Sequence, residues 1–216
     1  MTTPDDASGA IDMILTPASK DLGDHFVVRR ALPAAQRRMV GPFVFFDEMG
    51  PAHFSAGSGL DVRPHPHIGL STVTYLFDGA IRHRDTLGVL QDITPGALNL
   101  MTAGRGIAHS ERTPPDTRAA GGPVWGPVSY THLAVEIEGV RVEAGRMVIL
   151  AGAAPVMVQA VSEARIAVLG GESDGPRRLW WNFVASDQDR IEQAKADWIA
   201  GRFGLPDGET EFIPAP

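Results

Sequence analysis

Short strand-forming segments separated by tight turns follow one another in the middle of this 216-residue chain, and this pattern leaves few folds open. Asp78-Gly79 is a hairpin signal, so the segment that starts at residue 80 is expected to return beside the one that ends at Phe77. Pro95-Gly96 and the glycines of 104–106 end later segments. The predicted strands cover residues 71–77, 80–85, 90–93, 97–102 and 107–111. Regularly spaced short strands of this kind predict an antiparallel barrel or sandwich.

The strand pattern continues on both sides of this region, and a helix is predicted only near the end of the chain. Ser186 is a helix-capping residue followed by apolar residues at helical spacing, so a helix is expected at about residues 186–200. The Gly- and Pro-rich stretches 50–63 and 112–131 are expected to form a loop and a linker. Further strands are predicted at residues 11–15, 25–30, 43–46, 134–137, 141–143, 147–150, 155–161 and 165–169. The expected fold is therefore all-β.

Two pairs of candidate metal ligands lie on predicted strands. In RPHPHIG, His65 and His67 are two positions apart and project from one face of a strand, while Pro66 faces the other way and stiffens it. In GRGIAHSER, His109 and Glu111 have the same spacing. If the two pairs face each other inside a barrel, they offer three imidazole nitrogens and one carboxylate oxygen. Such a set suits octahedral Fe(II), and also Mn, Co or Ni, whereas Cu and Zn are less favoured.

A structural role is the competing interpretation of these histidines. The chain has seven histidines, and a lone one is more often a surface or core residue than a metal ligand. However, the chain has no cysteine, so any metal site must use His, Asp or Glu. The second pair, His109 and Glu111, comes after several further strand signals. Two pairs favour a metal site more strongly than a single His-x-His would.

Other polar residues give weaker signals. For His83, two interpretations are open: it is a partner of a metal ligand, or it forms a surface hydrogen bond with Asp85. Asp47 and Glu48 are expected to lie at a solvated strand end rather than to act as catalytic acids. The histidines that have no partner at ligand spacing are His25, His53 and His132.

The chain resembles the pirin family, a branch of the cupins, in the runs RPHPHIGLSTVTYLFDGAIRHRDTLG and MTAGRGIAHSE. It also resembles family segments in FDEMGPA, in GGESDGPRRLWWNFVASDQDRIEQAKADW and in the closing GRFGLPDGETEFIP. The general cupin pattern expects a ligand Glu where this chain has Thr72, and Glu111 of the second run replaces it. The resemblance implies a cupin-type antiparallel β-barrel whose metal ligands are His65, His67, His109 and Glu111.

The resemblance implies two alternative functions. Some pirins are quercetin 2,3-dioxygenases, so the first expectation is a non-haem iron dioxygenase acting on a small aromatic substrate such as a flavonol. Glu111 would then be both a ligand and the catalytic base for the substrate hydroxyl. Other pirins are iron-dependent transcriptional cofactors, so the alternative is a redox-sensing regulator that binds a protein partner without catalysis. From strand alternation, the residues expected to line the substrate site are Val73, Tyr75, Leu98 and Leu100.

Pirins contain two cupin barrels, of which only the first binds metal. The expected organisation is a disordered tail at 1–10, a metal-binding cupin domain at 11–125 and a second cupin domain at 126–216. Residues 126–185 offer only about five strands, whereas a closed barrel needs about eight. The segment GPVSYTHLAVEIEG stands where the family continues with other strands. We therefore expect an internal deletion in the second domain, which leaves an incomplete sheet and uncovered apolar surface.

Charge and hydropathy limit the partners. The net charge of −7 disfavours direct binding to nucleic acid, because an acidic surface repels phosphates. The polar, acidic N-terminus is neither a signal peptide nor a transit peptide, and no apolar run approaches the length of a membrane span. The expected location is the cytoplasm, with no membrane partner.

Overall fold

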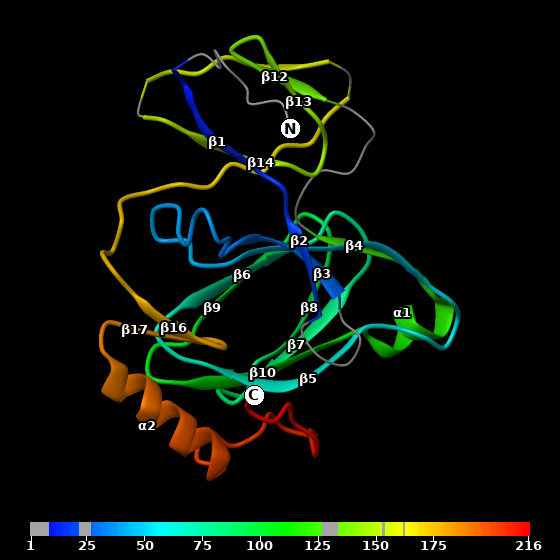
Figure 1. The fold of residues 1–216 in the computed structure, drawn as a ribbon. Helices are drawn as coiled ribbons and strands as arrows, with labels where there is room; N and C mark the ends of the chain where they lie inside the picture. The colour runs from blue at the N-terminus through cyan, green and yellow to red at the C-terminus, as the bar shows by residue number, and fades with distance from the viewer. Residues whose placement is uncertain (1–8, 22–26, 127–133, 153, 162) are drawn as a thin grey trace. The chain divides into compact units, whose positions relative to one another are not determined.

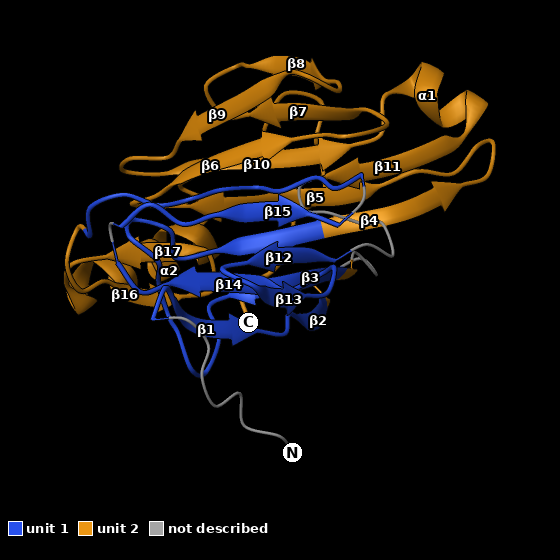
Figure 2. Cartoon of the chain, turned by 90° about the horizontal axis from the view of Figure 1, so that it is seen from above, with its two compact units in different colours: residues 1–20, 28–48, 127–173 blue, residues 21–27, 49–126, 174–216 orange. Residues whose placement is uncertain are grey.

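The computed structural model describes residues 9–21, 27–126, 134–152, 154–161 and 163–216, and most regular structure in these residues is β-strand (Figure 1). The chain divides into two compact units, each of which draws on segments from before and after residue 126 (Figure 2). Unit 1 comprises Met1–Lys20, Val28–Glu48 and Pro127–Ser173. Unit 2 comprises Asp21–Val27, Met49–Gly126 and Asp174–Pro216. The predicted tail at 1–10 lies mostly outside the described residues, as do His25 and His132.

The main sheet of unit 2 has the antiparallel strand order β5-β10-β7-β8. Its strands are β5 (Asp61–His67), β10 (Ile107–Arg112), β7 (Ile81–Asp85) and β8 (Leu90–Ile93). Pro64 and Pro66 explain why β5 lies at the edge, because proline has no N–H to donate to a second neighbouring strand. Both prolines are fully buried, and Pro66 lies opposite Ala108 of β10.

A β-bulge in β5 sets the direction of the side chains on this strand. Opposite β10, His65 pairs with His109 and Val62 with Glu111, so β5 advances three residues while β10 advances two. The extra residue lies at Arg63–Pro64. Because strand side chains alternate between faces, the bulge turns Val62 and His65 to the same, inner face, although they are three positions apart. Both side chains are buried there.

The predicted hairpin at Asp78-Gly79 is wrong. Strand β6 (Ser71–Tyr75) pairs with β9 (Leu98–Thr102), whereas β7 pairs with β8 and β10. The turn instead carries the chain past β11 (Gly122–Gly126), where Asp78 bridges to Trp125. Gly79 has φ +81°, and a Cβ added there would lie 2.3 Å from the carbonyl oxygen of Pro123. Glycine is therefore required for the close approach of two strands rather than for a hairpin.

Unit 2 is held together by apolar clusters, of which two are large and a third comprises Met101, Ala103 and Ile107. The first large cluster fills the space beneath the main sheet, and its buried members are Leu60, Val62, Leu76, Ile81, Ile93 and Val124. The second gathers around Phe183, where α2 (Gln188–Ile199) packs against β16 (Arg178–Trp180) and β17 (Phe183–Ala185). The predicted helix is thus present, but its cap is Asp187 and not Ser186. The Asp187 carboxylate accepts a hydrogen bond of 2.8 Å from the backbone N–H of Arg190.

In unit 1, strand β1 (Ile11–Leu15) pairs with β14 (Met147–Leu150) over a core of Leu15, Leu32 and Ile149. A second small sheet has the order β13-β12-β15. Its strands are β13 (Val140–Val142), β12 (Val135–Ile137) and β15 (Val158–Ala160). Within the described residues after 126, the strands do not close into a barrel. Several large apolar side chains are exposed here, namely Leu150, Met157, Val158, Val161, Ile166 and Val168.

Strand β4 (Phe46–Phe54) lies where a short strand and a loop were predicted. Its pairing with β11 supplies backbone hydrogen bonds that outweigh the turn preference of Gly50-Pro51. Strands β3 (Val27–Leu32) and β2 (Ala18–Asp21) come earlier in the chain. The predicted solvated strand end is wrong for Glu48, which is buried and paired with Arg29.

Two further expectations fail. The linker predicted at 112–131 contains α1 (Pro115–Ala120) and β11, because Pro115 is compatible with the first turn of a helix. The strand predicted at 165–169 is absent, and this described segment is irregular.

Candidate metal site

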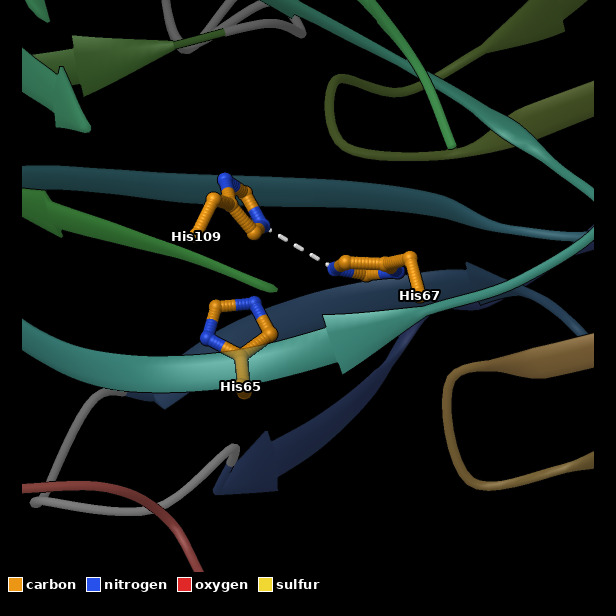
Figure 3. A group of neighbouring side chains, drawn as sticks. All are labelled: His65, His67 and His109. Carbon is orange, nitrogen blue, oxygen red and sulfur yellow. Dashed lines mark hydrogen bonds between the residues drawn. The ribbon is translucent and has the colours of Figure 1, made fainter. Parts of the chain in front are cut away.

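Three histidines meet on the inner face of the main sheet of unit 2 (Figure 3). His65 and His67 come from β5, and His109 comes from its neighbour β10. Their ligand nitrogens all lie within 4.8 Å of one another, and the Nε2 atoms of His67 and His109 are 3.0 Å apart. The side chains are almost entirely buried, with 8% of His65, 8% of His67 and 3% of His109 exposed. The two strands therefore bring together the histidines of both predicted pairs.

Burial keeps two of the three rings, those of His67 and His109, in the protonation state that a metal requires. The pKa values of His67 and His109 lie well below the ordinary imidazole range, first because burial penalises the charged ring. The positive charge that His65 and His83 can carry lowers both values further. A neutral imidazole has a free lone pair, and only this form binds a metal ion. The rings of His67 and His109 are therefore in the neutral form that can bind a metal ion.

The donor atoms fit a transition metal. Two ligand nitrogens that bind one ion at right angles, with bonds of about 2.1 Å, are separated by about 3.0 Å. The Nε2 atoms of His67 and His109 have this separation. The Nδ1 atom of His65 lies 3.0 Å from the carbonyl oxygen of Arg63, to which it can donate, and in that neutral tautomer Nε2 carries the lone pair. A set of three imidazoles favours Fe, Co, Ni, Cu or Zn over Ca or Mg, which prefer oxygen.

Glu111 lies on the same face but outside the group of three. Its carboxyl group accepts a hydrogen bond from Thr74 of β6 and lies close to His83. Burial raises the pKa of the Glu111 carboxyl, and the charge of His83 and the hydrogen bond from Thr74 partly offset this shift. Its role as fourth ligand stays a prediction. The sequence did not single out Thr74, although it follows Thr72 by two positions and so faces the same way.

Of the remaining candidate histidines, His83 lies beside the group of three and His53 does not. His83 is buried beside His109, with their Nδ1 atoms 3.3 Å apart, and its Nε2 lies 3.2 Å from a buried Asp85 oxygen. The interpretation of His83 as the partner of a candidate ligand is therefore supported. The predicted hydrogen bond with Asp85 is also present, but it is buried rather than at the surface. His53 is exposed on β4, away from any such group.

The predicted lining residues point the wrong way. On β6 and β9, Val73 lies opposite Leu100 and Tyr75 opposite Leu98, so these four share one face. That face is the outer one, because Val73, Leu98 and Leu100 are between 51% and 63% exposed. The buried residues of these strands include Thr74, Asn99 and Met101. Assigning the apolar face to the interior fails here because the interior holds polar groups around the histidines.

An all-β architecture that gathers three buried histidines from two adjacent antiparallel strands defines a cupin-type protein with a site able to hold a divalent metal. Comparisons with known proteins narrow this class. The Pirin family model matches residues 25–125, and the model of the Pirin C-terminal cupin domain matches residues 128–204. The chain therefore belongs to the pirin family.

Individual relatives agree with this assignment. A pirin-like protein of Caulobacter vibrioides is 38% identical, with 95% of this chain and 99% of that protein covered. A Pseudomonas aeruginosa protein named "Putative quercetin 2,3-dioxygenase" is 51% identical over 49% of this chain and 34% of its own length. Among solved structures, a quercetin 2,3-dioxygenase from Acinetobacter baumannii has a TM-score of 0.80 and 27% identity, with 94% of each chain covered.

The alignment with the Caulobacter protein extends over 287 positions, which exceeds the 216 residues of this chain. Part of the Caulobacter protein therefore has no counterpart in this chain.

Neither helix in the described residues has the length and apolar character that crossing a bilayer requires.

Proposed function

We propose that this chain is a metal-dependent dioxygenase of the quercetin 2,3-dioxygenase type, which holds Fe(II) through His65, His67, His109 and Glu111. The observation that carries the proposal is the convergence of three buried imidazoles, two of them with Nε2 atoms 3.0 Å apart and with lowered pKa values. The relatives named as quercetin 2,3-dioxygenases support the reaction class and a small aromatic substrate.

A bound metal would supply a Lewis-acidic, redox-active centre for dioxygen and a deprotonated substrate oxygen. The protein's own contribution is positional. Backbone and side-chain hydrogen bonds fix the rings of His65 and His109, and the surrounding buried residues keep bulk water away from the nitrogens. Such exclusion strengthens every electrostatic interaction inside the site.

Glu111 is the proposed base for the substrate hydroxyl. A raised carboxyl pKa brings a base closer to the working pH, where it can both accept and release a proton. The Thr74 hydrogen bond orients the carboxyl group from β6. We expect Glu111→Gln to retain the shape of the side chain but to lower turnover roughly 10²-fold, if general base catalysis operates. Equal oxygen uptake by Glu111→Gln and the parent at matched iron content would remove Glu111 from the mechanism.

Metal content and oxygen uptake with quercetin test the proposal together. The parent protein should bind one iron per chain and consume oxygen when quercetin is added. His65→Ala and His109→Ala should lose stoichiometric metal, because a site with so few protein ligands has little redundancy. His53→Ala, which removes an exposed histidine of the same unit, is the matched control and should behave as the parent. Full iron occupancy in the His65→Ala/His109→Ala double variant would refute the site.

The same measurements separate the enzyme from the regulator. A parent protein that binds iron stoichiometrically but takes up no oxygen with quercetin would contradict the dioxygenase proposal. An affinity for a protein partner that changes with the oxidation state of the iron would then favour a redox-sensing regulator.

We further propose that the chain keeps the two consecutive cupin domains of its family, at 11–125 and 126–216, and that the second is shortened internally. The division is supported by the two family models, which match residues 25–125 and 128–204. The internal shortening is supported by the part of the Caulobacter protein that has no counterpart in this chain. The small open sheet β13-β12-β15 and the exposed apolar side chains of unit 1 are what a shortened domain would leave. Inserting the corresponding Caulobacter segment should raise the unfolding temperature and reduce aggregation; no change in either would contradict the proposal.

A further inference from the structure

A third strand of the main sheet adds two buried polar side chains to the metal site. In the register of β7 against β10, Asp85 lies opposite His109 and His83 lies opposite Glu111. Because opposite residues share a face, His83 and Asp85 point to the same side as the histidine group. Both are buried, with exposures of 2% and 4%. They therefore belong to the interior around the metal ligands and not to the surface.

Hydrogen bonds link these residues in a line that ends at His109. One oxygen of Asp85, Oδ1, accepts from the backbone N–H groups of Leu87 and Val89, at 2.9 and 3.1 Å. The other oxygen, Oδ2, lies 3.2 Å from Nε2 of His83. At the far side of the ring, Nδ1 of His83 lies 3.3 Å from Nδ1 of His109. The line is Asp85, His83, His109.

The chemistry of these groups sets the direction of each hydrogen bond. Asp85 accepts two backbone N–H donors at Oδ1, and an aspartate carboxylate only accepts. Nε2 of His83 must then carry the proton that it donates to Asp85. In a neutral imidazole the other nitrogen is an acceptor, so Nδ1 of His83 accepts from the Nδ1–H of His109. This leaves Nε2 of His109 with a free lone pair, 3.0 Å from Nε2 of His67.

We propose that Asp85 and His83 form a relay that holds His109 in the tautomer with a proton on Nδ1, and so makes Nε2 its metal-binding atom. Both are positioning residues, since His83 acts on His109 and Asp85 acts on His83. The inference deepens the proposed metal site and rests on it for the identity of His109 as a ligand.

The three candidate histidine ligands differ in the group that determines the tautomer of the ring. A backbone carbonyl, that of Arg63, fixes Nδ1 of His65. The Nδ1 atom of His67 is buried without a hydrogen-bond partner among the described residues. His109 is the ligand whose tautomer depends on side chains, and therefore the one that a substitution can invert.

Asp85→Asn is the sharpest test because the surroundings of residue 85 dictate how an amide must sit. The N–H groups of Leu87 and Val89 require an acceptor, so the amide oxygen must face them and the NH₂ group must face His83. Nε2 of His83 then becomes an acceptor and its Nδ1 a donor. Nδ1 of His109 has to accept, which moves its proton to Nε2 and blocks the metal-binding lone pair.

The first readout is the tautomer of His109 in metal-free protein, from proton–nitrogen correlation spectra of labelled histidine side chains. The signals of His109 are identified by their loss in His109→Ala. The parent should show a protonated Nδ1, and Asp85→Asn a protonated Nε2. A parent with a protonated Nε2, or an unchanged tautomer in Asp85→Asn, would overturn the relay.

The second readout is affinity for Co(II), measured by competition with a chromophoric chelator. Removing an outer partner of a ligating histidine typically weakens metal binding about 10- to 100-fold, and we expect this loss in Asp85→Asn. Asp92→Asn is the matched control, because it removes the same charge from an exposed position on β8 of the same sheet. Its affinity should stay within about twofold of the parent. Equal losses in both variants would assign the effect to charge alone and contradict the relay.

His83→Leu covers the case in which Asp85→Asn does not fold. It removes the acceptor of the His109 proton and should lower Co(II) affinity by a similar factor, with a mixture of His109 tautomers. Retention of a single Nδ1-protonated tautomer in His83→Leu would refute the role of His83. If the parent binds no Co(II), the metal site fails, and the tautomer of His109 in the metal-free parent still decides the relay.

Discussion

Metal-free protein should lose stability on mild acidification because of its buried histidines. The pKa values of His67 and His109 are lowered in the folded protein, whereas the unfolded chain has the ordinary imidazole value of 6.5. Below this value the unfolded chain takes up protons that the folded protein does not, so the free energy of unfolding falls as the pH falls. The stability is therefore fully present above pH 6.5 and is lost progressively below it.

The size of the effect follows from the proton difference. Between pH 7.5 and 5.5, one histidine that stays neutral when folded lowers the free energy of unfolding by about 1.4 kcal/mol, and two lower it by about 2.7 kcal/mol. Glu111 acts in the opposite direction. Its raised pKa means that the folded protein keeps a proton that the unfolded chain releases, so this residue destabilises the fold as the pH rises above its ordinary value.

Urea unfolding in the presence of a chelator, at pH 7.5 and 5.5, measures these terms. His67→Gln should reduce the stability loss by about 1.4 kcal/mol, because one of the two imidazoles with a lowered pKa is gone. Glu111→Gln removes the opposing contribution, so its loss should be at least as large as that of the parent. His53→Gln, at an exposed position, should leave the loss unchanged. A loss of the same size in the parent and in His67→Gln would refute the reasoning.

Three further predictions concern the packing that supports the site. Asp187→Ala removes the cap of α2 and should cost about 1 kcal/mol in urea unfolding; no change would show that another group caps the helix. Phe183→Ala empties a fully buried position beside α2 and should cost about 3–5 kcal/mol by the same measurement, and a cost below about 1 kcal/mol would contradict the packing. Glu209→Gln weakens charged hydrogen bonds from Arg112 on β10 and should cost about 1.5–3 kcal/mol, with thermal unfolding as the check; an unchanged unfolding temperature would show that this pair is not stabilising.

The candidate ligands were predictable because their signal is local. Alternation along a strand places His65 beside His67, and this depends on no knowledge of the neighbouring strands. The family resemblance then joined that pair to His109, and the structure brings the three rings together. The helix near the end of the chain was predictable for the same reason, although its cap was misplaced by one residue.

The surroundings of the ligands were not predictable because they depend on strand order. The turn at Asp78-Gly79 suggested that β6 and β7 are neighbours, but β10 and β8 flank β7 and β9 pairs with β6. Only this order places His83 against His109. The same limit explains the error at Val73 and Leu98, since alternation shows which residues share a face but not which face is inside.

The bulge at Arg63–Pro64 determines which changes in chain length this site can survive. Deleting one codon there would remove the bulge and leave Val62 and His65 two positions apart, so regular pairing would keep His65 and His67 on the inner face. Deleting two codons would leave Val62 and His65 adjacent, which would turn His65 and His67 to the outer face while Val62 stays in the core. A mutation that touches no ligand, and that barely alters composition, could thus remove the metal site. At this point of the chain, the number of residues between Val62 and His65 decides which face the ligand side chains take.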